Sequence, residues 1–231
     1  MTLLNISPFA ISRWGAFFNH FDLFFKGFLY TLGISFGALL LALILGILSG
    51  GLSTSKSKVG KLISRIYVEV FQNTPLLVQM FFVYYGLAII SNGHIMISAF
   101  FTAVLCVGLY HGAYISEVIR SGIEAVPKGQ TEAALAQGFT ANQTMQLIIL
   151  PQAIRTILPP MTNQVVNLIK NTSTVAIISG ADIMFLAKAW AYDTTNYIPA
   201  FAGAAIFYFV ICFPLASWAR KQEELNKKTY S

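Results

Sequence analysis

The residues with the most chemical potential are polar side chains that recur at helical spacing inside apolar segments of the chain. Four of them are spaced by four, four and three residues and so share one helical face, with a lysine beside them: Asn163, Asn167, Asn171, Thr174 and Lys170. The opposite face of the same helix is aliphatic. The row offers amide donors and acceptors, a hydroxyl group and one cation, which suits the binding of a polar solute.

Two other apolar segments carry similar rows. One is formed by Glu69, Gln72 and Gln79 with Asn73 and Thr74 adjacent, and the other by Tyr110, Tyr114 and Glu117. Pro75 follows the first row and frees carbonyl groups of the preceding turn, so we expect a bend whose polar atoms are available to a solute. We interpret the three rows as the lining of a translocation pathway. The alternative is hydrogen bonding between helices, where each bond is worth about 0.6–2 kcal/mol.

Lys170 and Glu69 are ionisable members of these rows. Burying an ionisable group in hydrocarbon costs several kcal/mol. We therefore expect both side chains to face the bundle interior, a water-filled cavity or each other. For Glu69 an ion pair of purely structural importance is an alternative.

Other reaction chemistry is not supported by the sequence. The histidines His20, His94 and His111 have no partner four residues away, so no metal site is expected. Cys106 and Cys212 lie inside apolar runs and are interpreted as packing residues. The chain contains no G-x-x-x-x-G-K-[ST] loop and no obvious pairing of a nucleophile with a base. We therefore expect neither ATP hydrolysis nor an intramembrane enzyme.

The elements that carry these rows are long apolar segments. Hydrophobic residues make up 56% of the 231 residues and charged residues only 10%, against about 25% in soluble domains. We expect an all-α integral membrane protein with five transmembrane helices, at about 24–50, 62–90, 96–121, 156–180 and 198–219. The net charge of +6 comes from basic clusters between the spans. These clusters predict an outside N-terminus and a cytoplasmic C-terminus, and no binding to nucleic acid.

We expect three parts along the chain. Residues 1–23 are aromatic and weakly charged, which suits a segment at the outer membrane interface. Residues 24–220 form a transmembrane domain in contact with membrane lipid, and its first apolar run is too long for a signal peptide. Residues 221–231 form a cytoplasmic tail.

The longest polar stretch of the transmembrane domain is a cytoplasmic loop at about 127–151. Pro127 breaks the third helix, and Gln130 or Thr131 can cap a new short helix. Gly138 can end that helix. The loop is therefore expected to contain one or two short helices at the cytoplasmic surface.

The same loop carries a spaced set of residues. The run Glu132-Ala133-Ala134 is followed by Gly138 and then by Ile148, Leu150 and Pro151. This set resembles the EAA signature of bacterial ABC-importer permeases, and every fixed position matches. The stretches at 67–86 and 167–178 are similar to the polar amino-acid permeases of the histidine, glutamine, glutamate and arginine type. The resemblance covers roughly residues 20–225.

The resemblance implies a type I importer core with five helices per subunit, in which two permeases, identical or related, work on a pair of ATPase subunits. ATP and Mg²⁺ belong to the ATPases in such a system, and this chain binds no cofactor. An extracytoplasmic binding protein delivers the amino acid. The EAA segment implies a coupling helix in a cleft of the ATPase, formed by Glu132, Ala133, Ala134, Leu135, Gly138 and Phe139. On composition alone, an ordinary amphipathic surface loop is the alternative.

The family also implies a function, the import of a polar amino acid across the bacterial cytoplasmic membrane by alternating access. The carboxylate of a zwitterion fits Lys170 or Asn171, and its ammonium group fits Glu69. Donors outnumber acidic groups on the rows, which favours glutamine, glutamate or aspartate, with a basic amino acid as the alternative. Gln72, Asn73 and Thr174 differ from the usual family residues and would shift the cargo preference. An ion-driven carrier is the rival class, but it usually has two inverted halves, and no internal repeat is detected.

Overall fold

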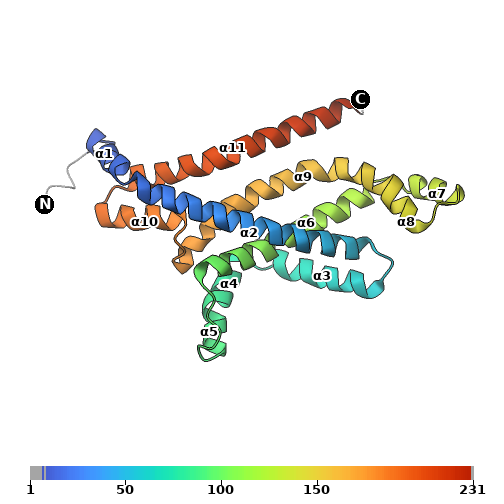
Figure 1. Ribbon diagram of the computed structural model, residues 1–231, viewed down its shortest axis with the longest axis horizontal. Coiled ribbons are helices and arrows are strands. Elements are labelled where there is room, and N and C mark those ends of the chain that lie inside the picture. The colour runs from blue at the N-terminus through green and yellow to red at the C-terminus, as the bar shows by residue number, and fades with distance from the viewer. Residues whose placement is uncertain (1–6, 8, 230–231) are drawn as a thin grey trace.

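The computed structural model describes residue 7 and residues 9–229, and every element among them is helical (Figure 1). The α-helices are α1 (Ile11–Asn19), α2 (Phe21–Thr54), α3 (Lys58–Gln72), α4 (Leu76–Phe81), α5 (Leu87–Ile90), α6 (Ala99–Glu124), α7 (Lys128–Ala136), α8 (Ala141–Gln143), α9 (Leu150–Asn171), α10 (Ile183–Thr194) and α11 (Tyr197–Thr229). Two π-helical segments, η1 (Phe82–Gly86) and η2 (Thr144–Ile149), and a 3-10 helix, η3 (Thr172–Ile178), lie between them. The bundle is elongated, with α1 and α7 at opposite ends (Figure 1).

The helices provide the expected spans. Three are long and apolar enough to cross a bilayer: α2, α6 and the Tyr197–Lys221 part of α11. Two more candidates are broken helices, in which α3 leads into α4 and α5 through a bend of 96°, and the Ala141–Ile178 segment leads into α10 through a bend of 47°. If each bent pair is one span, the total is the predicted five. Residues 1–6 and 8 of the expected interfacial segment, and residues 230–231 of the expected tail, lie outside the described chain.

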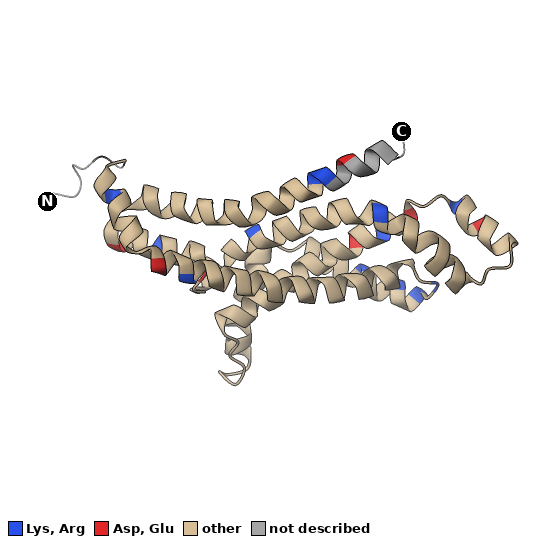
Figure 2. Ribbon diagram, turned by 45° about the horizontal axis from the view of Figure 1, so that its top comes forward, with Lys and Arg blue, Asp and Glu red and all other residues tan. Residues whose placement is uncertain are grey.

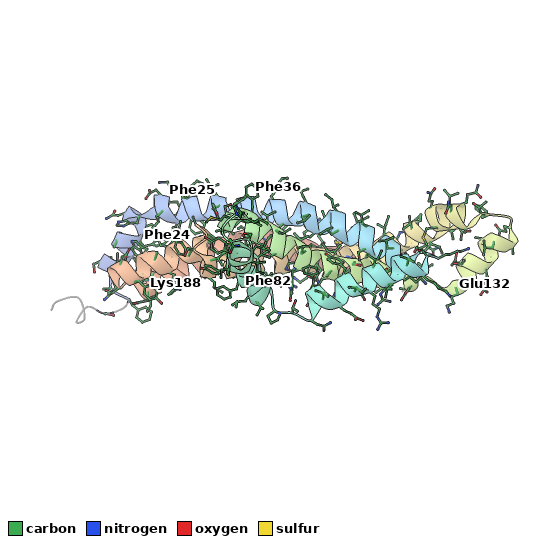
Figure 3. All side chains as sticks on the ribbon, turned by 90° about the horizontal axis from the view of Figure 1, so that it is seen from below. Phe24, Phe25, Phe36, Phe82, Glu132 and Lys188 are labelled. Carbon is green, nitrogen blue, oxygen red and sulfur yellow. The ribbon has the colours of Figure 1, made fainter. Side chains whose placement is uncertain are left out.

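The predicted span at 62–90 is not a single straight helix. Pro75 has no N–H group to continue the hydrogen-bond ladder, and the helix stops at Gln72 and starts again at Leu76. The second half, α4 to α5, leaves the bundle as a side arm that carries Phe82 (Figures 1 and 3). The sequence predicted a bend at Pro75, but a bend of 96° separates the two halves far more than we expected.

Helix α10 was not predicted. Asp182, which is fully buried, accepts a hydrogen bond from the backbone N–H of Met184 at 3.0 Å and so caps the start of this helix. The N–H of Ile183 donates to Thr31 Oγ1 at 3.1 Å, which ties the same helix end to α2. The fourth predicted span therefore covers only α9 and η3, and its continuation, α10, bends by 47° and packs on α2 and α11.

The centre of the bundle is the contact between α2 and α6. Ala38 and Ala42 of α2 are fully buried against α6. A methyl group on Gly50 would lie 2.8 Å from Ile119 Cβ, and one on Gly46 would overlap Ile115. Small residues thus let the two helix backbones approach closely.

Aromatic residues close the end of the bundle that carries α1. The ring centroid of Phe24 in α2 lies 4.6 Å from that of Phe17 in α1 and 5.5 Å from that of Trp190 in α10. Arg13 Nη1 donates to Thr195 O at 2.8 Å and to Asn196 Oδ1 at 2.9 Å. Helix α1 is therefore fixed to α2 and to the turn between α10 and α11. Its place at the outer interface of the membrane stays a prediction.

Candidate functional site

The loop between α6 and α9 forms a compact elbow, which we define as residues 127–149. Pro127 precedes α7, and Gly138 ends it with a φ of +88°, a backbone angle that favours glycine. Thr140 then caps α8, since its Oγ1 accepts from Gln143 N at 3.3 Å and its own N–H donates to Gln143 Oε1 at 2.9 Å. The prediction of short helices with Gly138 as a terminator is confirmed. The predicted cap was wrong, because α7 begins at Lys128, before Gln130 and Thr131.

The residues of the EAA segment lie on different sides of α7. Glu132 and Ala133 are exposed, and Leu135 exposes 49% of its surface (Figure 3). Ala134 is buried, with 5% exposure, where α7 packs on η2. Phe139 is half-buried. Glu132, Ala133 and Leu135 are therefore open to a partner, whereas Ala134 fills space inside the elbow itself.

Five of the predicted pathway residues meet in a cavity of about 300 Å³ between α6 and α9, which we call the amide cavity. Its lining consists of Tyr110, His111, Tyr114, Gln164, Asn167, Lys170 and Asn171. Among the lining residues, Lys170 is the one lysine or arginine, and none is an aspartate or glutamate. The cavity can therefore present a cation, amides and hydroxyl groups to a bound solute.

Hydrogen bonds order part of the amide cavity. Tyr110 and Tyr114 share one at 3.2 Å between their hydroxyl oxygens. Asn171 Nδ2 lies 3.0 Å from His111 Nε2, which joins α9 to α6. The aliphatic face of α9 packs inward, since Leu168 exposes only 1% and Val166 and Ile169 6% each. The division of α9 into a polar and a buried apolar face is thus as predicted.

A second polar cavity, of about 380 Å³, lies between α3 and α6 and is here called the charged cavity. It is lined by Ser53, Lys61, Ser64, Arg65, Val68, Glu69, Gln72, Glu117 and Arg120. Basic residues of α3 and α6 lie toward the end of the molecule that carries the elbow (Figure 2). Three predicted pathway residues, Glu69, Gln72 and Glu117, lie here and not in the amide cavity.

The acidic groups of the charged cavity are already paired. Glu69 Oε1 accepts from Arg65 Nε at 2.7 Å, and both side chains are more than half exposed. Glu117 accepts from Arg120 at 2.7 Å from Nη2 and at 3.0 Å from Nε, and Arg120 also contacts Glu124. Of the arrangements we expected for Glu69 and Lys170, they do not face one another, and each lines a different polar cavity. The structural ion pair, our alternative for Glu69, is what the structure contains.

The polar residues next to Pro75 bond to the helix break itself. Asn73 Nδ2 donates to Glu69 O at 2.8 Å, and Thr74 Oγ1 donates to Val70 O at 2.8 Å. Gln79 Nε2 donates to Phe71 O and to Thr74 O, both at 3.2 Å. The bonds to Val70 O and Phe71 O satisfy carbonyl groups at the break, whereas Glu69 O also accepts the backbone N–H of Asn73. None of the three side chains lines either cavity. Their predicted contact with a solute stays a prediction.

Two residues of the α9 row also lie outside the cavities. Asn163 is exposed and lies one helical turn before Asn167. Thr174 lies in η3, and its Oγ1 donates to Asn171 O at 2.6 Å. The row is continuous as a helical face, but only its middle borders the amide cavity.

Sequence reasoning missed several lining residues. His111 was considered as a metal ligand, but it is buried and its ring forms part of the cavity wall. Gln164 lies three residues before Asn167 on the same helical face, so the spacing that found Asn167 should have included it. Arg65 and Arg120 could have been found as partners of Glu69 and Glu117, at spacings of four and three residues.

Similar proteins give this geometry a context. A "Probable glutamine ABC transporter permease protein" of Bacillus subtilis (strain 168) is 35% identical over 213 residues, 92% of this chain and 97% of the relative. A "Probable amino-acid ABC transporter permease protein" of Vibrio harveyi is 36% identical over 200 residues, 85% of this chain and 89% of the relative.

Solved structures agree. A crystal structure of an amino acid ABC transporter with histidines matches with a TM-score of 0.84 and 32% identity, over 91% of this chain and 97% of that chain. An inward-facing structure of the MetNI methionine ABC transporter matches with a TM-score of 0.66 over 88% of this chain and 98% of that chain, at 18% identity, and so supports the fold alone.

The family model described as "Binding-protein-dependent transport system inner membrane component" matches residues 42–224. Proteins of this family are multi-pass inner-membrane subunits that work with a separate ATPase and a substrate-binding protein, and ATP hydrolysis is the task of the ATPase. By this match and by its fold, the chain belongs to the inner-membrane components of binding-protein-dependent transport systems, the permease subunits of ABC importers.

Proposed function

We propose that this permease carries a polar amino acid through the amide cavity and that the elbow drives the opening of that cavity. One observation carries the proposal. The elbow connects α6 directly to α9, and these two helices supply the whole lining of the amide cavity. A push on the elbow therefore acts on both walls of the cavity, which is what alternating access requires.

The lining supports a zwitterion with a neutral or acidic side chain as cargo. Lys170 can receive a carboxylate through a charge-assisted hydrogen bond. A basic cargo would add a positive charge to a cavity that holds no carboxylate. The carboxylates of Glu69 and Glu117, which such a cargo needs, are paired with arginines in the charged cavity. We therefore favour glutamine, glutamate or aspartate, and the name of the Bacillus relative agrees with this choice.

The two cavities define a route. We propose that cargo is held in the amide cavity and leaves past Gln72, Glu69 and Glu117 of the charged cavity. Gln72 Nε2 donates to Ala113 O at 3.2 Å, next to Tyr114 of the amide cavity, so it lies near the boundary between the two. The orientation with an outside N-terminus and a cytoplasmic C-terminus puts the elbow and the charged cavity on the cytoplasmic side.

The exposed part of the EAA segment is the proposed contact with the ATPase. Glu132, Ala133 and Leu135 form the surface, while Ala134, Gly138 and Phe139 give the elbow its shape. A second permease, identical or related, completes the translocation unit, and an extracytoplasmic protein delivers the amino acid. ATP and Mg²⁺ bind to the ATPase subunits.

Neighbouring alanines separate docking from folding. Ala134→Asp puts a carboxylate in a buried position without a partner, which costs several kcal/mol, so it should disorder the elbow and abolish coupled uptake. Ala133→Asp changes an exposed position, so it should leave the elbow folded and weaken only ATPase binding. Protease protection of the elbow and co-purification of the ATPase report the two effects. Coupled uptake that survives both substitutions would remove the elbow from the mechanism.

The function itself is tested by reconstitution. The permease with its ATPase and binding protein is placed in vesicles, and uptake of radiolabelled glutamine, glutamate and arginine is measured with ATP and without it. We expect ATP-dependent uptake of glutamine or glutamate. Uptake driven by an ion gradient without ATP would instead establish a secondary carrier, and uptake of arginine alone would reverse our choice of cargo.

A further inference from the structure

His111 is buried, exposing 2% of its surface, yet it lies in the wall of the amide cavity. Its ring packs edge-on against Tyr110, with 5.4 Å between the ring centroids. Its Nε2 receives Asn171 Nδ2 at 3.0 Å. The contact is the point where α6 and α9 exchange a side-chain hydrogen bond across the cavity.

The hydrogen-bonding roles of the His111 ring and the Asn171 amide in this contact depend on each other. An amide nitrogen can only donate, so the His111 Nε2 must accept and the ring must be neutral, with its proton on Nδ1. Nδ1 is buried and has no hydrogen-bond partner among the described residues. Gln164 is the other polar neighbour of the ring. With the Asn171 nitrogen facing Nε2, the position of the ring proton and the direction of the Asn171 amide are therefore coupled, and each depends on the other.

The Asn171 side chain is left with one free polar atom. Its nitrogen is engaged by His111, and its Oδ1 accepts no hydrogen bond from the described part of the chain. Turning the amide by 180° would reverse the pattern, with nitrogen free and oxygen engaged, but it would require the proton on His111 Nε2. Which atom Asn171 offers to the cavity thus depends on His111.

We infer that His111 is a specificity-determining positioning residue, which holds the Asn171 oxygen free so that the amide cavity prefers a cargo side-chain amide to a carboxylate. The inference rests on the proposed function. With the cargo α-carboxylate at Lys170, the free Oδ1 accepts from a side-chain NH₂ group. A side-chain carboxylate has no proton to donate and would face this oxygen unpaired, which is unfavourable. The cavity is therefore built for glutamine or asparagine ahead of glutamate or aspartate.

The ring proton gives a direct test that needs no transport. The chain has three histidines, so the permease in complex with its ATPase, labelled with ¹⁵N-histidine in lipid nanodiscs, gives a simple spectrum, and the His111→Leu variant assigns the His111 signals. We expect a protonated Nδ1 and an unprotonated Nε2. A ring protonated on Nε2, alone or on both nitrogens, would place the amide the other way and overturn the inference.

Binding tests the consequence for cargo. Equilibrium dialysis of radiolabelled glutamine and glutamate against the permease–ATPase complex is done without the binding protein, because the receptor would impose its own preference. Wild type should prefer glutamine, and His111→Leu should reduce that preference about fivefold, the worth of one ordinary hydrogen bond. His111→Asn, a smaller polar substitution, guards against loss of folding, and His94→Leu, on an exposed loop, is the matched control and should change nothing.

The outcomes are separable. If the His111 variants weaken both ligands equally, the residue is only a packing element and the inference fails. If wild type binds neither ligand and imports neither, the proposed cargo fails, while the NMR result still reports on the His111–Asn171 pair. A preference for glutamate in wild type, with the ring protonated as we expect, would also overturn the inference.

Discussion

The amide cavity and the charged cavity are of similar size, but they differ in whether their polar groups are paired with one another. In the charged cavity, arginines and glutamates bond to one another, as in the pairs of Arg65 with Glu69 and of Arg120 with Glu117. In the amide cavity, Lys170 has no ion-pair partner among the described residues, and the oxygen of Asn171 is free. Groups that are already paired brace helices, whereas unpaired groups that line a cavity are available to a ligand.

The largest expected effect comes from the free cation. Lys170→Met keeps the length of the side chain but removes the charge, and the cargo carboxylate loses a charge-assisted hydrogen bond. Affinity for glutamine should fall about 10- to 100-fold, measured by equilibrium dialysis on the permease–ATPase complex. The control is Lys188→Met, because Lys188, labelled in Figure 3, is an exposed lysine of α10 that lines neither cavity. If both variants bind glutamine with the same affinity, Lys170 does not bind the cargo carboxylate, and the proposed difference between the cavities is wrong.

A smaller effect is expected for the free amide. Asn171→Leu removes the acceptor and also leaves His111 without its partner, so affinity should fall about three- to tenfold. Asn163→Leu is the matched control on the same helical face, since Asn163 is exposed and borders neither cavity. If Asn163→Leu weakens binding as much as Asn171→Leu does, the whole polar face of α9 binds cargo. The binding site would then extend beyond the amide cavity.

Water access sharpens the same contrast. Lys170→Cys should react with small water-soluble thiol reagents, because the position lines an open polar cavity. Ala38→Cys, in the fully buried contact of α2 with α6, should stay unreactive. The rates are followed by mass spectrometry with and without ATP. A Lys170→Cys variant whose new thiol is inert in every condition would argue that the amide cavity stays dry.

The smallest effect on cargo is expected in the charged cavity. Arg120→Met breaks the pair with Glu117, which is about one-third exposed, so the loss of stability should be only about 1 kcal/mol. Thermal unfolding in detergent measures this loss. Cargo affinity in the amide cavity should change by less than about twofold, within the range of a remote surface substitution. A larger fall would mean that the two cavities act as one binding site.

The sequence predicted the parts of this molecule that depend on local pattern. The aliphatic face of α9 and the terminating role of Gly138 follow from helical spacing and from backbone angles, which are properties of a single segment. Each of these is visible before any other helix is placed.

The division of the polar rows into two cavities could not be predicted in the same way. It depends on how helices cross and on the 96° break at Pro75, which moves Gln79 away from the face that carries Glu69. The place of His111 in the cavity wall could not be predicted for a related reason, because its partner Asn171 lies 60 residues further along the chain. The helix α10 was missed because its start is set by a buried cap, Asp182, and by a contact with Thr31.

The self-satisfied helix break has a consequence for the order of assembly. Because Asn73, Thr74 and Gln79 bond to carbonyl groups of residues 69–74, much of the irregular backbone next to Pro75 is satisfied within the chain itself. We therefore expect a newly synthesised chain to bend at Pro75 before it meets a second subunit. Pairing and recruitment of the motor then become later events, limited by encounter in the membrane and not by folding.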